Sequence, residues 1–599
     1  MIKRKKQLVS LLLSLLLAVS LAGCSTPSRE GTADQGSSKA AAEQQAKTGR
    51  QKEFDKFLSR QVKESLSENT LNLHYQLKDP EKYGIRQKKV SIGHIVPGTD
   101  EKALEENKKT AKELAGFDRS SLTKEQKRTY DILKDYLDML IEEQKYPLYS
   151  NIIGDVSGIQ SNLPVTFAEY QFYRKKDADD YLELLSQLKG YLAEAGDYLK
   201  AQSEAGLYVT DKTADNAAKQ IDDFLKESGS KNILSATFKE RINSLSGLSN
   251  KQKSDYIKRN KKLLSGSVYP GFREFKKTIL SLKGTGKNSG GVCRLKNGKD
   301  YYQLVLRQQT GTDKTINELG LKVTQRLQSC MRQMMQLMES DKSLQKKFYS
   351  FDPVMTNPKK ILEDLEKQAK KDYPPLKKVN YKIKYVPEAL EDTLSPAFYM
   401  IPPMDDESEN TIYINKGSTD KNGLYTTLAH EGYPGHLYEN NYFLGTDPDD
   451  IRLIMDFPGY SEGWASYVEM HAYDYVPYDK SVGKLLRVNT EMNMCLGSVM
   501  DIKVNYSGWS LSKAKEFLKN IGYSTSDAER LYRLVTAEPG YYLKYYAGAL
   551  EFQELRSRAS KELGKKFEAK EFHRAVLENG PSNFAAVRKA VEAYIKENK

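Results

Sequence analysis

Apolar residues recur every three or four positions through most of residues 52–378, the spacing that gathers them on one face of an α-helix. Four segments with this pattern are predicted as helices, at residues 122–140, 181–202, 316–338 and 358–372. Segments rich in Gly and Ser interrupt the pattern and are predicted as a short turn at 265–267 and a longer loop at 284–291. We therefore expect a large helical N-terminal region.

The pattern changes near Val379, where polar and apolar residues alternate over short runs. Three segments have the two-residue period and the composition of strands, at residues 381–386, 398–401 and 411–415. Helical spacing returns at Leu424 and continues to the end of the chain. The predicted fold class is therefore mainly α, a large helical body with a small mixed β-sheet, divided into regions 52–378 and 379–599.

Residues 1–23 have the pattern of a secretory signal, in which basic residues precede a Leu-rich run. The run is shorter than the roughly 20 residues of a transmembrane helix. It ends in the sequence LAGC at Cys24, which resembles a bacterial lipobox. The resemblance implies cleavage before Cys24 and lipidation of its thiol, so we expect the mature chain outside the cytoplasm, lipid-anchored to the membrane. Residues 24–51 lack apolar periodicity and are predicted as a flexible tether.

Composition excludes several classes of protein. The formal net charge is +13, but Lys and Arg are spread along the whole chain rather than gathered in one block, which argues against a nucleic-acid partner. Besides Cys24 the chain has three Cys, with no CxxC pair among them. Neither a zinc ribbon nor a thioredoxin-like redox motif is therefore available, and the fold must be held together by packing.

Two of the six His residues lie close together in the segment His430–His436, with the sequence HEGYPGH. In the H-E-x-x-H motif of zinc peptidases the two His are four residues apart on one helix face, and the Glu addresses the metal-bound water. Here they are six residues apart, about 240° around a regular helix. Gly432, Pro434 and Gly435 permit a bulge or an unwound turn that would bring both imidazoles to one metal.

A third ligand is available in the segment 457–467, where a helix is predicted to begin at Glu462. Two His and a carboxylate from a second helix are a common zinc-binding set in peptidases, with water in the fourth position. In such a site Glu431 would accept the proton of the water and pass it to the leaving amine. The residues alone leave alternatives open, because residues 430–436 could be a capped polar helix end and Glu462 a carboxylate favoured by the helix dipole.

Several motifs, in their order along the chain, resemble those of the bacterial domain-of-unknown-function family 885, lipoproteins related to the gluzincin metallopeptidases. The resemblance covers about residues 52–599 and rests on segments 386–388, 399–403, 413–415, 430–436, 462–465, 539–545, 572–573 and 579–580. It implies that residues 379–599 form a zincin-like catalytic region, with the small sheet beside the active-site helix. It further implies Zn²⁺ as the cofactor, held by His430, His436 and Glu462, with Glu431 as the general base.

The chain departs from the family pattern at two positions. Leu437 stands where many members have a second His, so no ligand is available there. Gly497 stands where members have an Arg a few residues before the position of Asp501. A substrate contact by that Arg is therefore absent from this chain.

Other residues are candidates for contact with the substrate. An oxyanion needs a hydrogen-bond donor besides the metal, and Tyr545, Tyr546 and His573 are the candidates, although Tyr545 and His573 could equally be structural. If the strand that contains Tyr413 and ends at Asn415 lies at the edge of the sheet, it could pair with a peptide backbone.

The predicted function is that of a zinc-dependent peptidase that hydrolyses oligopeptides, or amide bonds of wall peptides, outside the cytoplasm. The chief alternative is a surface lipoprotein that binds peptides or a partner without catalysis. In that case the segment around His430 would be structural, or would bind a metal without turnover. The sequence makes no prediction of the oligomeric state.

Overall fold

The computed structural model describes residues 47–599 except positions 228, 288–289, 351–352, 354, 387–390, 392–394, 407, 409, 419–422 and 478. The predicted signal, Cys24 and most of the predicted tether lie outside the described residues. The first helix among the described residues begins at Gly49, slightly before the predicted end of the tether at residue 51. Within the described ranges, every helix is too short or too polar to cross a membrane.

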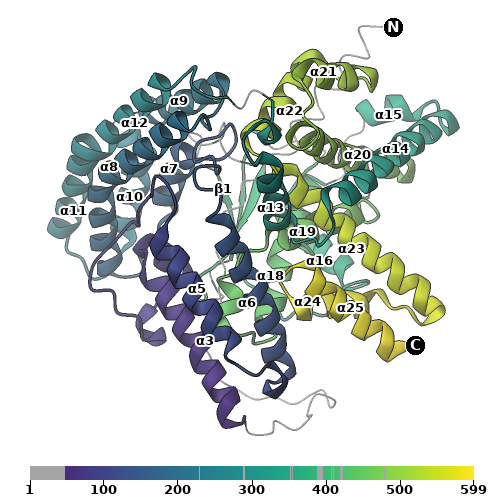
Figure 1. Ribbon diagram of the computed structural model, residues 1–599, viewed down its shortest axis with the longest axis horizontal. Coiled ribbons are helices and arrows are strands. Elements are labelled where there is room, and N and C mark those ends of the chain that lie inside the picture. The colour runs from purple at the N-terminus through teal and green to yellow at the C-terminus, as the bar shows by residue number, and fades with distance from the viewer. Residues whose placement is uncertain are drawn as a thin grey trace.

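The described chain is mainly helical, as predicted (Figure 1). The helices before the sheet are α3 (Gly49–Ser67), α4 (Thr70–Gln76), α5 (Glu101–Ala115), α6 (Lys124–Glu143), α7 (Ile159–Glu169), α8 (Lys175–Glu204), α9 (Asp211–Lys226), α10 (Ile233–Ser244), α11 (Asn250–Leu263), α12 (Tyr269–Ser281), α13 (Gly298–Thr310), α14 (Ile316–Ser340), α15 (Leu344–Ser350) and α16 (Pro358–Ala369). Those after it are α17 (Leu424–Glu431), α18 (His436–Leu444), α19 (Pro458–Ala472), α20 (Lys480–Asn505), α21 (Leu511–Asn520), α22 (Thr525–Ala537), α23 (Tyr541–Leu563), α24 (Ala569–Asn579) and α25 (Phe584–Asn598). The four predicted helices correspond to α6, α8, α14 and α16.

The predicted turn at residues 265–267 is wrong. Residues Leu264–Val268 form a π-helical turn that joins α11 to α12 without leaving the helix. Leu264 and Val268 are buried, and the Ser265 hydroxyl donates to the Lys261 carbonyl at 3.0 Å. Burial of the two apolar side chains outweighs the low helix propensity of Gly266, which local sequence alone does not reveal.

Three strands form a mixed sheet with the order β1-β3-β2, comprising β1 (Tyr381–Tyr385), β2 (Ala397–Met400) and β3 (Asn410–Ile414). β3 pairs in parallel with β1 and antiparallel with β2. Every residue of β3 is buried, because its two faces pack into different hydrophobic clusters. Ile412 and Ile414 belong to one cluster and Tyr413 to the other. The central strand therefore holds the two halves of the molecule together.

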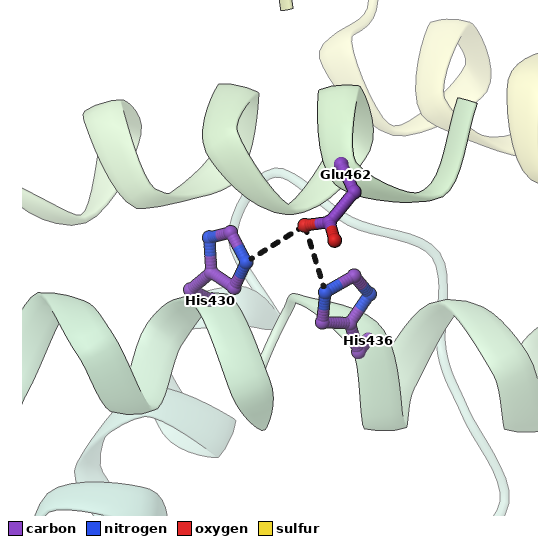
Figure 2. Close-up of side chains that lie close together, drawn as sticks. All are labelled: His430, His436 and Glu462. Carbon is purple, nitrogen blue, oxygen red and sulfur yellow. Dashed lines mark ion pairs between the residues drawn. The ribbon is translucent and has the colours of Figure 1, made fainter. Parts of the chain in front are cut away.

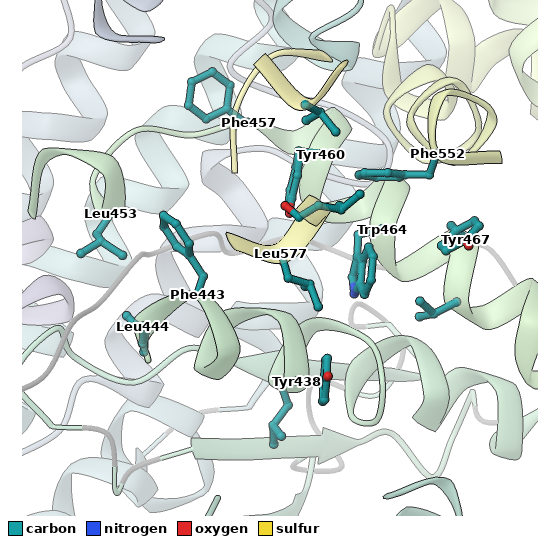
Figure 3. Packing of buried hydrophobic residues seen from close by; sticks show 14 of the residues in the cluster. Tyr438, Phe443, Leu444, Leu453, Phe457, Tyr460, Trp464, Tyr467, Phe552 and Leu577 are labelled. Atoms are coloured by element: carbon teal, nitrogen blue, oxygen red, sulfur yellow. The ribbon is translucent and has the colours of Figure 1, made fainter. Parts of the chain in front are cut away.

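The two clusters lie within different groups of helices, which Figure 1 shows. Helices α7–α12, on the left of the view, pack around one cluster on one face of the sheet. The larger cluster contains side chains from α3, α5 and α6 together with side chains from α16–α19 and α23–α25, and Figure 3 shows part of it around Trp464 and Phe552. This core joins residues on both sides of the predicted boundary at residue 378.

Helices α19 and α23 cross in close contact, which glycines permit. A Cβ on Gly548 would lie 1.9 Å from the Gly459 carbonyl oxygen, and a Cβ on Gly463 would lie 2.5 Å from the Gly548 Cα. Neither clash involves the end of a flexible side chain, so the backbones themselves would have to separate. Because Glu462 precedes Gly463, this crossing also sets the position of the Glu462 carboxylate.

We predict that Gly548→Ala lowers the free energy of unfolding by about 1–3 kcal/mol, because the added methyl group overpacks the crossing. Chemical denaturation measures the change. Gly190→Ala, in the interior of α8 with nothing within 4 Å of the added Cβ, is the matched control and should stabilise by about 0.5–1 kcal/mol. Equal effects of the two substitutions would contradict the close contact.

Candidate metal site

The helix carrying the first His is interrupted before the second, as the spacing requires. α17 ends at Glu431 and α18 begins at His436, with residues 432–435 outside helical geometry. A Cβ on Gly435 would lie only 1.8 Å from the His430 carbonyl oxygen, and one on Gly432 would lie 2.8 Å from the Leu428 carbonyl oxygen. The backbone can double back here only because both positions are glycine.

The interruption is held in place by the neighbouring helix. Trp464 of α19 is fully buried, and its indole N–H donates to the Pro434 carbonyl oxygen at 2.9 Å. The backbone N–H of Tyr438 donates to the Gly432 carbonyl oxygen at 3.1 Å and closes the loop. The unwound segment is thus fixed to the helix that supplies the third candidate ligand, two residues before Trp464.

His430, His436 and Glu462 converge on one point (Figure 2). Glu462 Oε2 lies 3.5 Å from His430 Nε2 and 3.7 Å from His436 Nε2, and the three candidate ligand atoms lie within 4.8 Å of one another. Ligands at about 2.1 Å from a tetrahedral zinc ion would be separated by about 3.4 Å. The spacing of these atoms therefore fits one zinc ion.

Two further observations test whether these residues suit a metal. His430 is buried, and its Nε2 makes no hydrogen bond of ordinary geometry to any described residue. Its Nδ1 lies 3.1 Å from Glu469 Oε2, also on α19. A metal-binding His commonly donates its second N–H to a carboxylate, which orients the ring and raises its basicity. The donor set of two imidazoles and a carboxylate, with this support, fits zinc.

Charges around the site favour an ionised Glu462. Burial alone would raise the pKa of this carboxyl, but Lys544 and the two His hold it well below its usual range. Lys544 Nζ lies 3.5 Å from Glu462 Oε1, on the oxygen that does not face the His pair. Burial alone would lower the pKa of His430, but Glu462 and Glu469 raise it well above its usual range. The excess of negative charge around His430 is the electrostatic environment expected of a cation site.

Glu431 lies between the candidate ligands and the sheet. Its Oε2 accepts a hydrogen bond from the backbone N–H of Tyr399 at 2.9 Å, and burial raises the pKa of its carboxyl. Tyr399 is in β2, and its N–H points away from β3. The edge strand beside the site is therefore β2.

The prediction that Tyr413 and Asn415 lie at a sheet edge is wrong, because β3 is the central strand. The Tyr413 hydroxyl donates to the Glu169 carboxylate, and its ring stacks on Phe398 at 4.8 Å. The Asn415 side chain donates to the Glu391 carbonyl oxygen at 2.8 Å. Both residues hold the sheet together and cannot pair with a substrate backbone.

The three candidate oxyanion donors lie in different surroundings. Burial raises the pKa of Tyr545 well above its usual value, and the negative charges of Glu462 and Glu431 add to the shift. The Tyr546 hydroxyl donates to Glu491 at 3.0 Å, outside this group. His573 is also outside it, because its Nε2 lies 2.8 Å from the Tyr467 hydroxyl and its Nδ1 2.7 Å from the Asp372 carbonyl oxygen. The structure thus makes His573 a core residue with both nitrogens bonded.

The site opens into a cavity of about 610 Å³, within the size range of small-ligand pockets. Its wall includes residues of the N-terminal helices, such as Tyr136 and Tyr301, and residues of the edge strand β2. Glu431, His436 and Glu462 also line it. A molecule in the cavity would therefore contact both the candidate metal ligands and the N-terminal region.

Sequence reasoning missed several residues of the site that helical spacing could have indicated. Glu469 follows Glu462 by seven residues and so shares its helix face. Glu439 follows His436 by three residues and lines the cavity. Tyr541 and Lys544, three residues apart at the start of α23, also line it. Each of these residues can be recognised as part of the site only after the neighbouring ligand has been identified.

The structure shows the surroundings of the two residues that depart from the family pattern, Leu437 and Gly497. Leu437 is fully buried in the larger core. A Cβ on Gly497 would lie 2.7 Å from the ring of Tyr542, so this position is filled from the neighbouring helix.

These features define a mainly helical protein with a small mixed sheet and a two-His, one-Glu candidate metal site. The chain belongs to the family described as bacterial protein of unknown function (DUF885), whose model matches residues 81–591. No curated protein matches it.

Two solved structures share the fold, and each is described as a putative lipoprotein. The one from Colwellia psychrerythraea has a TM-score of 0.81 at 19% identity, over 92% of this chain and 100% of that one. The one from Shewanella oneidensis, described as of unknown function, has a TM-score of 0.59 at 17% identity, over 90% of this chain and 99% of that one.

We predict that Glu469→Gln lowers the zinc affinity of the purified protein 10- to 100-fold, because the His430 ring loses its carboxylate partner. Competition with a chromophoric chelator measures the affinity. Glu516→Gln, on the exposed face of α21, is the control and should leave it unchanged. An unchanged affinity in Glu469→Gln would contradict this supporting role.

Glu439 should make stability depend on pH, because burial raises its pKa from 4.5 to about 8 in the folded state. A raised carboxyl pKa stabilises the fold fully below pH 4.5, and this contribution is lost as the pH rises through about 8. The stability of the wild type relative to Glu439→Gln should therefore fall by up to about 1.4 kcal/mol per pH unit between pH 5 and pH 8. Parallel urea denaturation curves at several pH values would show a constant difference if the prediction is wrong.

Proposed function

We propose that this protein is a zinc-dependent peptidase that hydrolyses oligopeptides outside the cytoplasm. The observation that carries the proposal is the convergence of His430, His436 and Glu462, with Glu431 beside them on the wall of a cavity. Two His, a carboxylate and an adjacent Glu are the parts that a zinc hydrolase requires.

In this proposal His430, His436 and Glu462 would hold the metal. A bound zinc ion supplies Lewis-acid chemistry, which polarises the scissile carbonyl group and makes water more acidic. Glu431 takes the proton of the attacking water and delivers it to the leaving amine. The hydrogen bond from the Tyr399 N–H fixes the orientation of the Glu431 carboxylate.

Other groups at the cavity would bind and orient the peptide. The Tyr541 hydroxyl is a candidate donor to the oxyanion, because Tyr541 lines the cavity beside Lys544. At the edge strand β2, the backbone groups of Ala397 and Ile401 point to the same side as those of Tyr399, away from β3. A substrate could add to this edge as a further strand, with affinity from main-chain hydrogen bonds.

The proposed location is the outer face of the membrane, with Cys24 carrying a lipid anchor. The lipobox-like sequence before Cys24 supports this location. The names given to the structural neighbours, both described as lipoproteins, agree with it.

We predict that Glu431→Gln reduces peptide hydrolysis by about 10²- to 10⁴-fold while stoichiometric zinc is retained, because it removes the proton acceptor and leaves the ligands intact. The measurement combines metal analysis with turnover of a broad oligopeptide library. His436→Ala is the companion variant and should lose both zinc and activity.

The same experiment decides against the alternative of a non-catalytic surface lipoprotein. Zinc binding by the wild type without turnover of any peptide would favour a binding protein. Turnover that is equal in the wild type and in Glu431→Gln would rule out Glu431 as the proton acceptor.

A further inference from the structure

The cavity wall is strongly acidic. Among the described residues that line it are six carboxyl groups, those of Glu143, Glu431, Glu439, Asp456, Glu462 and Glu538, and one Lys, Lys544, besides the candidate ligand His436. Lys544 is already engaged by Glu462. Glu538 is satisfied by the backbone N–H groups of Val156 and Ser157 at 2.9 and 3.1 Å. The roles of Glu431 and Glu462 are accounted for by the proposed chemistry.

Glu439 differs from the other acids because it is buried while no hydrogen bond or ion pair joins its carboxyl group to another described residue. It is 4% exposed, and its Oε1 is buried without a hydrogen bond. No cation lies in ion-pair distance among the described residues, and burial alone accounts for its raised pKa. Buried polar groups in folded proteins are nearly always paired, because leaving one unpaired destabilises the fold. A buried carboxyl group that lines a ligand-sized cavity and pairs with no described residue is expected to pair with a group of the ligand.

We propose that Glu439 binds a primary ammonium group of the substrate, so that the preferred substrates are short peptides with an amine near the scissile bond. That the ligand is a peptide rests on the proposed function. The amine could be the N-terminal α-ammonium group or the side chain of a basic residue, and both present the same chemistry to a carboxylate. An ammonium group beside Glu439 would supply the three N–H donors that the carboxylate lacks.

The composition of the wall favours a cation over an anion. Five tyrosines also line the cavity, at positions 136, 149, 301, 399 and 541, and aromatic faces attract ammonium groups. An anionic group would meet several carboxylates and only the engaged Lys544. An apolar side chain would leave Glu439 buried and unpaired.

The position of Glu439 also suits a group close to the reaction centre. Glu439 and His436 are three residues apart on α18, and both line the cavity. Residues at this spacing are neighbours on a helix surface, with Cβ atoms about 5–6 Å apart. A substrate group bound beside His436 would therefore have the Glu439 side chain as a neighbour on the wall of the cavity.

The test is equilibrium binding of the tetrapeptide Ala-Lys-Ala-Ala by titration calorimetry, with the zinc-loaded full chain carrying Glu431→Gln so that turnover does not interfere. Four forms of the peptide are compared: unmodified, acetylated on the N-terminus, acetylated on the Lys side chain, and acetylated on both. We expect one of the two single acetylations to weaken binding at least tenfold, which identifies the amine that is bound.

Adding Glu439→Gln should weaken binding of the unmodified peptide about tenfold. It should also abolish the difference in affinity between this peptide and the acetylated form that binds less tightly. This isosteric change keeps the shape of the side chain. Glu516→Gln in the same background is the charge-matched control and should keep the difference. The proposal is overturned if acetylation has no effect, if its effect persists in Glu439→Gln, or if none of the four peptides binds.

The result is separable from that of the proposed function, which is tested by hydrolysis. Amine-dependent binding through Glu439 in a chain that hydrolyses no peptide would uphold this inference and reject the peptidase. Hydrolysis whose rate changes neither with acetylation of the peptide amines nor with Glu439→Gln would uphold the peptidase and reject this inference.

Discussion

The site depends on one constraint, that the backbone leaves the helix between His430 and His436 and re-enters it within four residues. On a continuous helix the two imidazoles would point in different directions. Gly432 and Gly435 allow the carbonyl groups of the preceding turn to approach where any side chain would collide. The interruption is therefore a requirement of the geometry, and the rest of the core is arranged to hold it.

Helix α19 provides that support through three successive residues. Glu462 is the candidate ligand, Gly463 lets α23 approach the backbone, and Trp464 bonds to the interrupted segment. One turn of helix thus fixes the Glu462 carboxylate and lets α23 bring Lys544 to it. The same turn holds residues 432–435, which position the two His. Glu469, two turns further on, orients one of the imidazoles. A small displacement of α19 would therefore move the candidate ligands relative to one another.

Local sequence predicted the elements well and their long-range arrangement less well. The three strands and the candidate ligand triad follow from periodicity and from a recognisable motif, and the helix break follows from two glycines and a proline. The order of the strands does not, because the two-residue period identifies each strand but not the strands with which it pairs. His573 was a candidate because of its residue type, and only packing reveals that both ring nitrogens are bonded. Glu439 looked like an ordinary helix residue until the cavity was known.

The wall of the cavity is assembled from widely separated parts of the chain, since it includes both Tyr136 and Pro581. No short fragment of the chain can reproduce such an enclosure. A nascent or partly translocated polypeptide therefore carries the HEGYPGH segment without the pocket around it. If the chain is exported as proposed, hydrolytic competence would arise only after the last helices have folded on the far side of the membrane, which would protect cytoplasmic peptides during biosynthesis.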